Sequence, residues 1–274
     1  MPKHIACLTF DFDAMSGLVS RGLTTPTPVS RGEFGAVAVP RILNLLEKHT
    51  IPSTFFIPGV VLETYPDVSR SVHHAGHEIG NHGWTHVPPA NLTPEEEETA
   101  LLRSSEAIAA ITGRNPTGYR SASFDLSPVT AQLLSKHGFA YESSMMGHDH
   151  SPYRLRLGDV VDPSGQVTFG QECDVIEMPV SWNLDDFPHF EFLRMPNSIM
   201  PGLAPADAVL ENWINDFRYM CETEEWGVLT FTFHPYVIGR GHRMIFLQRL
   251  IEAISDMGGV FMNMNDAVLE FRGK

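Results

Sequence analysis

The sequence contains few cysteines, few basic residues and no long apolar runs. Its three cysteines, Cys7, Cys173 and Cys221, are widely separated and form no C-x-x-C pair. This argues against a disulfide framework and fits a reducing cytosol. The 33 acids outnumber the 19 lysines and arginines, which gives a formal net charge of −14. Because no basic cluster interrupts this balance, we expect neither nucleic acid nor an anionic membrane as a partner.

The N-terminal segment MPKHIACLTFDFD has one lysine and only a short apolar run before its acids. It does not match a secretory signal, and no apolar stretch of the chain approaches the length that spans a membrane. We therefore expect a cytoplasmic protein.

The sequence does contain enough apolar residues for a large core. Its 274 residues are 43% hydrophobic, and this length suits one large domain or two small ones. We find no internal repeat, low-complexity segment or linker that would divide the chain. We therefore expect one catalytic domain over residues 1–274.

Strand and helix patterns alternate along the chain. Short apolar runs predict buried strands over 4–10, 53–58, 77–82, 117–121, 139–144, 173–180, 226–234 and 259–264. Apolar residues at helical spacing predict helices over 38–50, 60–75, 93–113, 127–137, 205–222 and 242–257. This alternation predicts an α/β fold with a parallel sheet, and the number of strands favours a (β/α) barrel of about seven strands.

Three long stretches have no clear periodicity: 14–35, 145–172 and about 183–204. Loops of this length in a compact domain are usually functional lids or oligomer contacts. We expect residues 14–35 and 181–192 to act as lids.

Four predicted strand ends carry side chains suited to catalysis or metal binding. Asp11 and Asp13 follow the first strand, although aspartate is a poor strand residue. His82 and His86 follow a later strand, and their spacing of four lets both imidazoles reach one metal ion on a turn or at the start of a helix.

Arg120 and His234 end two further strands. Each residue alone has a structural explanation, such as a turn, a salt bridge or a core histidine. In a parallel barrel, however, catalytic residues gather at the C-terminal ends of the strands. Their joint occurrence at corresponding strand ends favours a functional site.

These motifs resemble those of the polysaccharide deacetylases. TFDFD resembles the opening motif of that family, which implies that Asp11 is the base and Asp13 a metal ligand. HGWTH is similar to the motif with two metal-binding histidines, which implies metal ligation by His82 and His86. The opening motif of the family usually has adjacent acids followed by Gly-Pro, whereas Phe12 separates the two acids here.

Three further motifs extend the resemblance over most of the chain. YRSASF resembles the motif whose arginine contacts the base, which implies that role for Arg120, although the usual proline and aromatic arrangement is missing. LTFTFHP is similar to the motif with a histidine acid, which implies that role for His234. VIEMPVSWNLDD stands where the family has a groove wall.

The spaced DFD, HEIGNHGWTH and HPYVIGRGHR are similar to the intracellular branch of the family. That branch includes cyclic-imide hydrolases, allantoinase-like enzymes and an atypical peptidoglycan deacetylase. The resemblance implies a distorted barrel and a homo-oligomer, often a tetramer. The long loops and the missing export signal favour a small-molecule substrate.

An Asp-His-His site leaves open positions on a divalent ion for water and a substrate carbonyl. We expect one such ion, with zinc ahead of manganese, cobalt and nickel, which also accept nitrogen and oxygen ligands. Arg120 would orient Asp11 and favour its charged form, and His234 would protonate the leaving nitrogen.

Three residues near position 185 complete the candidate site. Asp185 or Asp186 either orients His234 or forms a turn, and both are candidates for substrate binding. Trp182 either lines the pocket or packs within the protein.

The leading hypothesis is a metal-dependent hydrolase of non-peptide carbon–nitrogen bonds that opens a small cyclic imide or a related cyclic amide. One alternative is an N-deacetylase of N-acetylated carbohydrate or peptidoglycan. The other is a metal-free binding protein with the same fold. The site chemistry itself suits an acetamide, a cyclic imide or a ureide.

Overall fold

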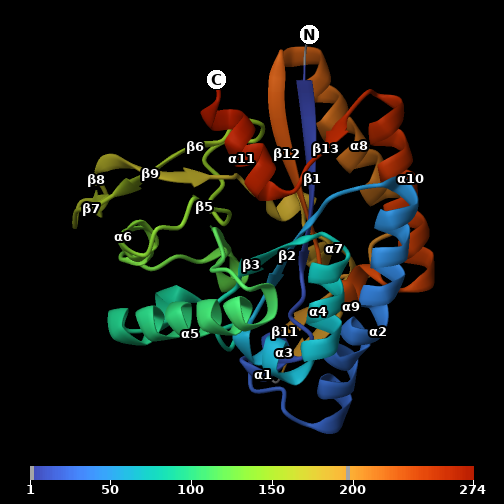
Figure 1. Cartoon of the computed structure of the whole chain (residues 1–274), viewed down its shortest axis with the longest axis horizontal. Coiled ribbons are helices and arrows are strands. Elements are labelled where there is room, and N and C mark those ends of the chain that lie inside the picture. Colours follow the sequence, from blue (N-terminus) through green and yellow to red (C-terminus); the bar gives the residue numbers. More distant parts are fainter. Residues whose placement is uncertain (1–2, 196–197) are drawn as a thin grey trace.

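A curled, mostly parallel sheet forms the centre of the computed structural model, which describes residues 3–195 and 198–274 (Figure 1). Within those residues nine strands form this sheet, and eight of them follow the order β12-β1-β2-β3-β4-β5-β9-β6. Their bounds are β1 (Lys3–Asp11), β2 (Thr54–Ile57), β3 (Glu78–Asn81), β4 (Gly118–Tyr119), β5 (Tyr141–Glu142), β6 (Tyr153–Leu157), β9 (Gln171–Glu177) and β12 (Trp226–Phe233). The ninth strand, β13 (Val260–Phe261), pairs with the first half of β1. The predicted α/β barrel of about seven parallel strands is confirmed as a half-barrel, with β6 antiparallel at one end.

Helices cover the outside of the curled sheet (Figure 1). The longer helices are α2 (Pro26–His49), α4 (Pro66–His74), α5 (Pro94–Thr112), α8 (Ala206–Thr223), α10 (Gly241–Asp256) and α11 (Met264–Arg272). The shorter helices are α1 (Ser16–Val19), α3 (Gly59–Thr64), α6 (Thr130–Lys136), α7 (Asp186–Phe190) and α9 (Pro235–Ile238). None of the helices in the described residues has the length and apolar character needed to cross a membrane.

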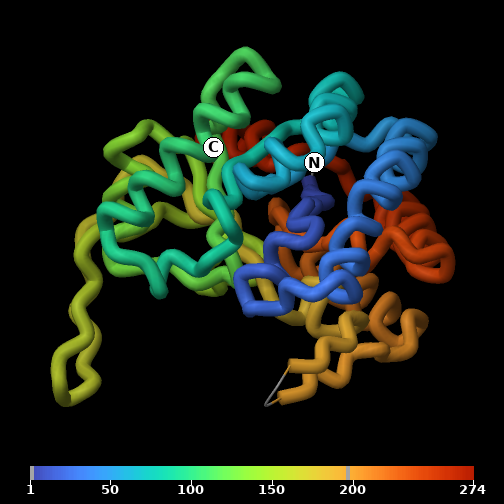
Figure 2. The backbone as a smooth tube through the Cα atoms, turned by 90° about the horizontal axis from the view of Figure 1, so that it is seen from below, coloured from blue at the N-terminus to red at the C-terminus, as the bar shows by residue number. Residues whose placement is uncertain are grey.

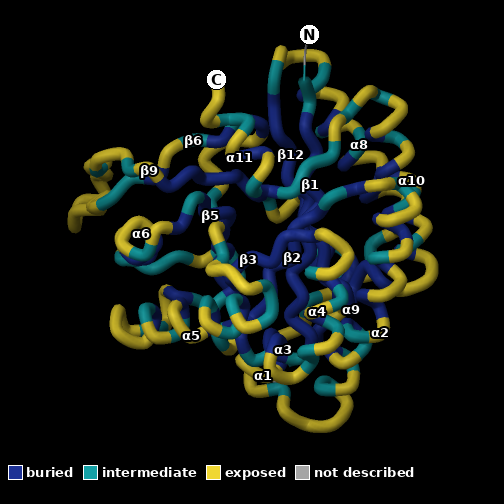
Figure 3. The backbone as a smooth tube through the Cα atoms, in the orientation of Figure 1, coloured by how far each residue is buried: buried dark blue, intermediate teal, exposed yellow. Residues whose placement is uncertain are grey.

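The central strand β1 is apolar along most of its length because it is covered on both faces. It pairs in parallel with β12 over eight consecutive positions, from Lys3 with Trp226 to Phe10 with Phe233. Parallel strands buried on both faces consist of continuous apolar residues rather than alternating ones. Figure 3 shows β1, β2 and β12 as the buried centre of the molecule.

Aromatic side chains fill the space between β1, β12 and the helices outside them. The Phe10 ring lies between Phe55 and Phe233, with centroids 4.8 and 5.4 Å away. Trp213 on α8 packs on Phe233 at 5.4 Å and on Phe246 of α10 at 5.2 Å. These contacts hold β1 and β12 rigidly together, and both strands end at the candidate site.

The predicted helix 93–113 is confirmed together with its start and stop signals. Thr93 and Glu96 form a reciprocal capping box, and Pro94 occupies the first turn. Gly113 ends the helix in the left-handed conformation with φ +76°.

Several local expectations were wrong. The helix predicted over 60–75 is broken at Tyr65, because Pro66 cannot continue the hydrogen bonding of α3 and instead begins α4. The supposedly irregular stretch 14–35 contains α1 and the start of α2. The stretch 145–172 contains β6 and a β7 (Val160–Val161) to β8 (Val167–Thr168) hairpin, which stands away from the body in Figure 2.

The third irregular stretch, 183–204, also contains regular structure. It includes α7, β10 (Leu193–Met195) and β11 (Ser198–Met200), and residues 196–197 lie outside the described residues. The helix α11 was not predicted at all.

Two carboxyl groups lie side by side at the ends of β5 and β9. Glu142 and Glu177 are register partners, and both are fully buried. Glu177 Oε1 accepts hydrogen bonds from the backbone N–H groups of Ser144 at 3.2 Å and Met145 at 2.9 Å. Burial, followed by the charge of Glu142 and a hydrogen bond with it, raises the pKa of Glu177 well above its ordinary range.

We expect Glu177→Gln to make the thermal stability less dependent on pH. The pKa of Glu177 is higher in the folded chain than its unfolded value of about 4.3. The folded wild-type protein therefore binds more protons, and its stability falls as the pH rises above that unfolded value. Glutamine does not titrate, so between about pH 5 and pH 8 the Tm of the variant should fall less than the Tm of the wild type. Glu172→Gln, at an exposed position of the same strand, is the matched control. An equally steep decline in Glu177→Gln would contradict the raised pKa.

Candidate active site

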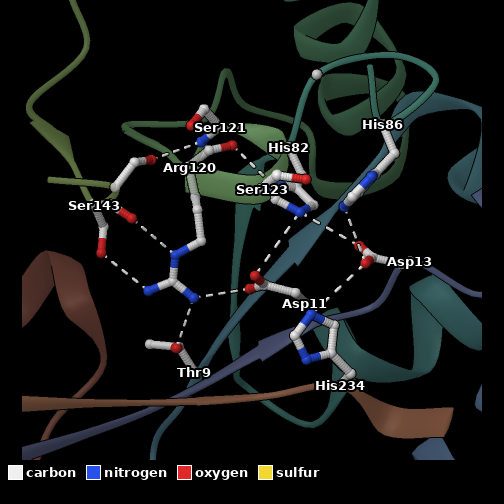
Figure 4. A network of polar contacts seen from close by, with 12 residues as sticks. Thr9, Asp11, Asp13, His82, His86, Arg120, Ser121, Ser123, Ser143 and His234 are labelled. Atoms are coloured by element: carbon white, nitrogen blue, oxygen red, sulfur yellow. Dashed lines mark hydrogen bonds and ion pairs between the residues drawn. The ribbon is translucent and has the colours of Figure 1, made fainter. Parts of the chain in front are cut away.

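Four strands of the sheet end at one edge, and each brings a polar side chain to that edge. β1 ends at Asp11, while His82, Arg120 and His234 directly follow β3, β4 and β12. Because these strands are parallel and paired in register, their ends meet at one level. Figure 4 shows the four side chains facing one another, with Asp13 beside them.

Asp13, His82 and His86 form a buried group that could hold a metal ion. Asp13 Oδ1 lies 3.3 Å from His82 Nε2, and Asp13 Oδ2 lies 3.1 Å from His86 Nε2. One ligand atom from each residue lies within 4.8 Å of the others. The structure thus brings together the three residues that the sequence suggested as ligands.

Several of these polar atoms lack ordinary partners. Asp13 Oδ1 and His82 Nε2 are buried and make no hydrogen bond to any described residue, although they face one another. Buried polar atoms are normally hydrogen-bonded. A cation bound between them would satisfy both lone pairs, so the donor set fits a divalent ion with nitrogen and oxygen ligands.

The charges around the group also favour a cation. Burial alone would raise the pKa of Asp13, but the charge of His86 and the close contacts with both histidines hold that pKa well below its ordinary range. Burial would lower the pKa of His82, but the charges of Asp11 and Asp13 outweigh it and raise that pKa. The surrounding carboxylates therefore stabilise positive charge at this point.

The loop that carries both histidines is held in an unusual backbone conformation. Gly83 and His86 have positive φ angles of 69° and 58°, and strained non-glycine residues of this kind often occur at functional sites. The Gly83 N–H donates to Asn81 Oδ1 at 2.9 Å. A Cβ atom at Gly59 would lie 2.1 Å from the Trp84 ring, so only glycine lets α3 approach this loop so closely.

The ring orientation of His82 is fixed by a backbone contact. Its Nδ1 lies 2.7 Å from the carbonyl oxygen of Arg120. This carbonyl can only accept, so Nδ1 carries the proton, and Nε2 faces Asp13. Such an outer hydrogen bond is typical of histidines that bind metal ions.

The Arg120 side chain is fully buried, and each of its three nitrogens donates to a defined acceptor (Figure 4). Its Nη1 donates to Asp11 Oδ1 and to Thr9 Oγ1, both at 2.8 Å. Its Nε donates to the Ser143 carbonyl oxygen at 3.0 Å, and its Nη2 donates to Ser143 Oγ at 2.9 Å. The guanidinium thus fixes Asp11, whose Oδ2 lies 3.8 Å from His82 Nε2.

His234 faces the same group from the opposite side. Its Nδ1 lies 2.8 Å from Asp186 Oδ1, and its Nε2 lies 3.8 Å from Asp13 Oδ2. Burial would lower the pKa of His234, but the carboxylates of Asp185 and Asp186 raise it to about 10. These carboxylates therefore favour the protonated imidazole, and its Nε2 faces the site.

The two neighbouring aspartates lie in different places. Asp186 is fully buried behind His234 and also accepts from the His234 backbone N–H at 3.0 Å. Asp185 lines the cavity, accepts from Phe187 N–H at 2.7 Å and caps α7. Burial and the charge of Asp186 raise the pKa of Asp185 to about 7, although His234 opposes this shift.

Asp185, Asp186 and His234 also lie close enough together to hold an ion. His234 Nδ1 is paired with Asp186 Oδ1, and Asp185 Oδ1 accepts from Phe187 N–H. This arrangement suits an oriented proton donor better than a second metal site.

A cavity of about 270 Å³ opens above these groups. Its floor contains Asp11, Asp13, His82, His86 and His234, and its walls contain Arg21, Ser123, Phe124, Trp182, Asp185, Phe187, Pro188 and Met200. Trp182 lies in the wall that the sequence suggested for it, with its ring 4.7 Å from that of Phe124. The wall is largely apolar, whereas the floor is charged.

The two segments expected as lids form much of this wall. Arg21 comes from the stretch 14–35, and Trp182 and Phe187 come from 181–192. A salt bridge of 2.5 Å joins Arg31 to the buried Glu191 and thereby connects the two segments.

Sequence reasoning missed several residues around the site. Ser143 and Thr9, which hold Arg120, lay in predicted strands without a motif of their own. Arg21 lay in a stretch without periodicity, and Phe124 was visible only as the end of YRSASF. Each of them contacts site residues that are distant from it in the sequence.

The sequence of this chain is similar to that of one family of known proteins. The family model for polysaccharide deacetylase matches residues 1–141. A Helicobacter pylori protein named peptidoglycan deacetylase is 36% identical over 264 residues, which cover 91% of this chain and 89% of that protein.

Solved structures are similar in fold. A structure described as a putative polysaccharide deacetylase from Mycobacterium smegmatis has a TM-score of 0.87 and 30% identity, and the match covers 99% of this chain and 91% of that one. The Puue allantoinase structure has a TM-score of 0.79 at 20% identity, with 100% of this chain and 91% of that chain covered, and this likeness concerns the fold alone. On these matches, the chain belongs to the polysaccharide deacetylase family.

Proposed function

We propose that this protein is a metal-dependent hydrolase that opens a small cyclic imide or a related cyclic amide. Membership of the family supports a hydrolase acting on carbon–nitrogen bonds. The observation that carries the finer proposal is the small cavity, about 270 Å³, directly above Asp13, His82 and His86. Asp11 and His234 flank this group, so an acid and a base face the same cavity.

Asp13, His82 and His86 would hold the divalent ion. An ion bound there would polarise an amide carbonyl as a Lewis acid and make water acidic enough to provide hydroxide near neutral pH. The unpartnered Asp13 Oδ1 and His82 Nε2 atoms support this assignment.

Asp11 would act as the general base. Its Oδ1 is held by Arg120, while its Oδ2 points toward His82 Nε2 and is the oxygen available to receive a proton from the attacking water. Arg120 would act by positioning this carboxylate, because each of its three side-chain nitrogens already donates within the protein.

His234 would act as the general acid. Asp186 binds Nδ1, so the proton on Nε2 is the one directed into the cavity. Transfer of that proton to the departing nitrogen would complete the cleavage of the carbon–nitrogen bond. Asp185 and Trp182, which line the cavity, would contact the substrate.

The size and shape of the cavity favour a compact planar substrate. Pockets for drug-sized ligands usually enclose about 300–1,000 Å³, so this cavity lies just below that range. The Phe124 and Trp182 rings form an apolar wall against which a planar ring could pack.

A second candidate function is N-deacetylation of an N-acetylated carbohydrate or peptidoglycan. The name of the Helicobacter pylori relative, at 36% identity, favours it. The same Asp11, His234 and metal-ligand groups would serve an acetamide. A metal-free binding role is less well supported, because a protein without the chemistry would not need all three candidate ligands.

We expect purified protein to contain about one equivalent of a divalent ion. His82→Ala/His86→Ala should lose most of it, because two of the three proposed ligands are removed. Elemental analysis measures the content, and His73→Ala/His74→Ala, at the end of α4, is a matched control with two histidines removed elsewhere. Equal metal content in the wild type and the His82/His86 variant would contradict the assignment.

Asp11→Asn should keep its metal and lose activity. Asparagine retains an oxygen that can accept from Arg120 but cannot take up a proton, so kcat should fall by about 10²- to 10⁴-fold. Asp67→Asn, on the exposed end of α4, is the control and should retain wild-type turnover. Normal turnover in Asp11→Asn would remove this residue from the mechanism.

Competition kinetics on the metal-loaded protein separates the two substrate classes. The panel contains succinimide, glutarimide, dihydrouracil, allantoin and chitotetraose. We expect the highest kcat/KM for an imide or a ureide, because such rings fit the cavity. Faster deacetylation of chitotetraose or peptidoglycan fragments would favour the N-deacetylase instead.

A further inference from the structure

We infer that Arg21 binds a carboxylate on the substrate. This inference rests on the proposed function, because it concerns the same cavity and defines its substrate class further. The substrate would be a small cyclic amide or imide that carries an anionic group on the side away from the scissile carbonyl.

The first observation is the pairing of charges in the cavity. Asp11 is bound by Arg120, Asp13 lies against two histidines, and Asp185 accepts from a backbone N–H. Arg21 is the arginine in the cavity wall, and no carboxylate of the described residues lies within 4.0 Å of its guanidinium nitrogens. Arg21 is exposed, so its charge is solvated and can also be reached by a ligand in the cavity.

The second observation is the position of the guanidinium. Arg21 Nη1 donates to the Gly17 carbonyl oxygen at 2.5 Å, and the guanidinium carbon lies 5.9 Å from the centre of the Phe187 ring. Arg21 Nη2 has a long contact of 3.4 Å with Ser123 Oγ. One edge of the guanidinium is thus anchored, while Nη2 makes only a weak contact across the cavity.

The third observation is the backbone that carries Ser123. Ser123 and Phe124 have positive φ angles of 58° and 54°, a conformation that non-glycine residues rarely adopt. This turn directs the Ser123 hydroxyl toward Arg21 and places the Phe124 ring against Trp182. In the cavity wall, the polar pair Arg21 and Ser123 thus lies next to the apolar rings of Phe124 and Trp182.

A guanidinium and a hydroxyl together suit a carboxylate. Guanidinium N–H groups bind carboxylate oxygens in a planar, charge-assisted geometry, and a serine hydroxyl can donate to the same group. The chain carries a formal net charge of −14, so an anionic substrate needs a local cation to overcome the general repulsion. A neutral ring would form no ion pair with Arg21.

Matched substrate pairs test this inference on the metal-loaded protein. Dihydroorotate differs from dihydrouracil by one carboxylate, and hydantoin-5-acetate differs from hydantoin by a carboxymethyl group. We expect kcat/KM to be at least tenfold higher for the anionic member of one pair. In Arg21→Gln this ratio should collapse through KM rather than kcat, and Arg21→Lys should retain part of it. Arg218→Gln, on the exposed side of α8, should leave the ratio unchanged.

Calorimetry provides a second measurement that does not depend on turnover. The probe is N-carbamoyl-L-aspartate, and its Kd should weaken at least tenfold in Arg21→Gln. If the protein hydrolyses none of the imides, ureides and paired substrates but this loss of binding is found, the proposed function fails and the carboxylate site stands. If both members are hydrolysed equally and Arg21→Gln changes neither the ratio nor the Kd, the carboxylate site is wrong and the proposed function stands.

Discussion

The buried guanidinium of Arg120 is the interaction on which the rest of the site depends. Its side chain connects Thr9 and Asp11 at the end of β1 to Ser143 beyond β5, and its carbonyl oxygen orients His82. One residue therefore sets both the candidate base and one candidate metal ligand. Removing one partner of a buried ion pair typically costs about 3–5 kcal/mol, because the other charge is left uncompensated. The geometry of the site and the stability of the sheet edge are consequently linked.

Around this arginine, the titratable groups at the strand ends differ widely in pKa. Asp13 keeps a pKa well below its ordinary range, whereas Asp185 on the far side has a pKa raised to about 7, and His234 one raised to about 10. These shifts arise because histidines surround Asp13, whereas Asp185 is buried next to a second carboxylate. Titratable groups whose environments separate their pKa values in this way are typical of acid and base pairs. Positive charge is thus favoured at two defined points of one cavity.

The sequence predicted what depends on local pattern and on motifs. The strands of the sheet other than β6 follow from short apolar runs, and the capped helix 94–112 follows from Thr93, Pro94 and Gly113. The contributions of Thr9, Ser143 and Arg21 could not be predicted, because each depends on a partner distant in the sequence or on a nonperiodic loop. The start of α2 was missed because its first turns are rich in proline, serine and glycine, which are weak helix signals.

The wall of the cavity, rather than its hydrolytic groups, must decide between the two substrate classes. Asp11, His234 and the candidate ligands would serve an imide and an acetamide equally, since both present a carbonyl and a departing nitrogen. The wall is not a loose lid: Arg31 binds the buried Glu191, and Arg243 donates to the Phe190 carbonyl oxygen at 2.9 Å. These contacts tie the segment carrying Phe187 to α2 and α10, which belong to the folded core. Exclusion of a long glycan would therefore be a property of the fold itself, and changing the substrate class would require moving this wall rather than altering the catalytic residues.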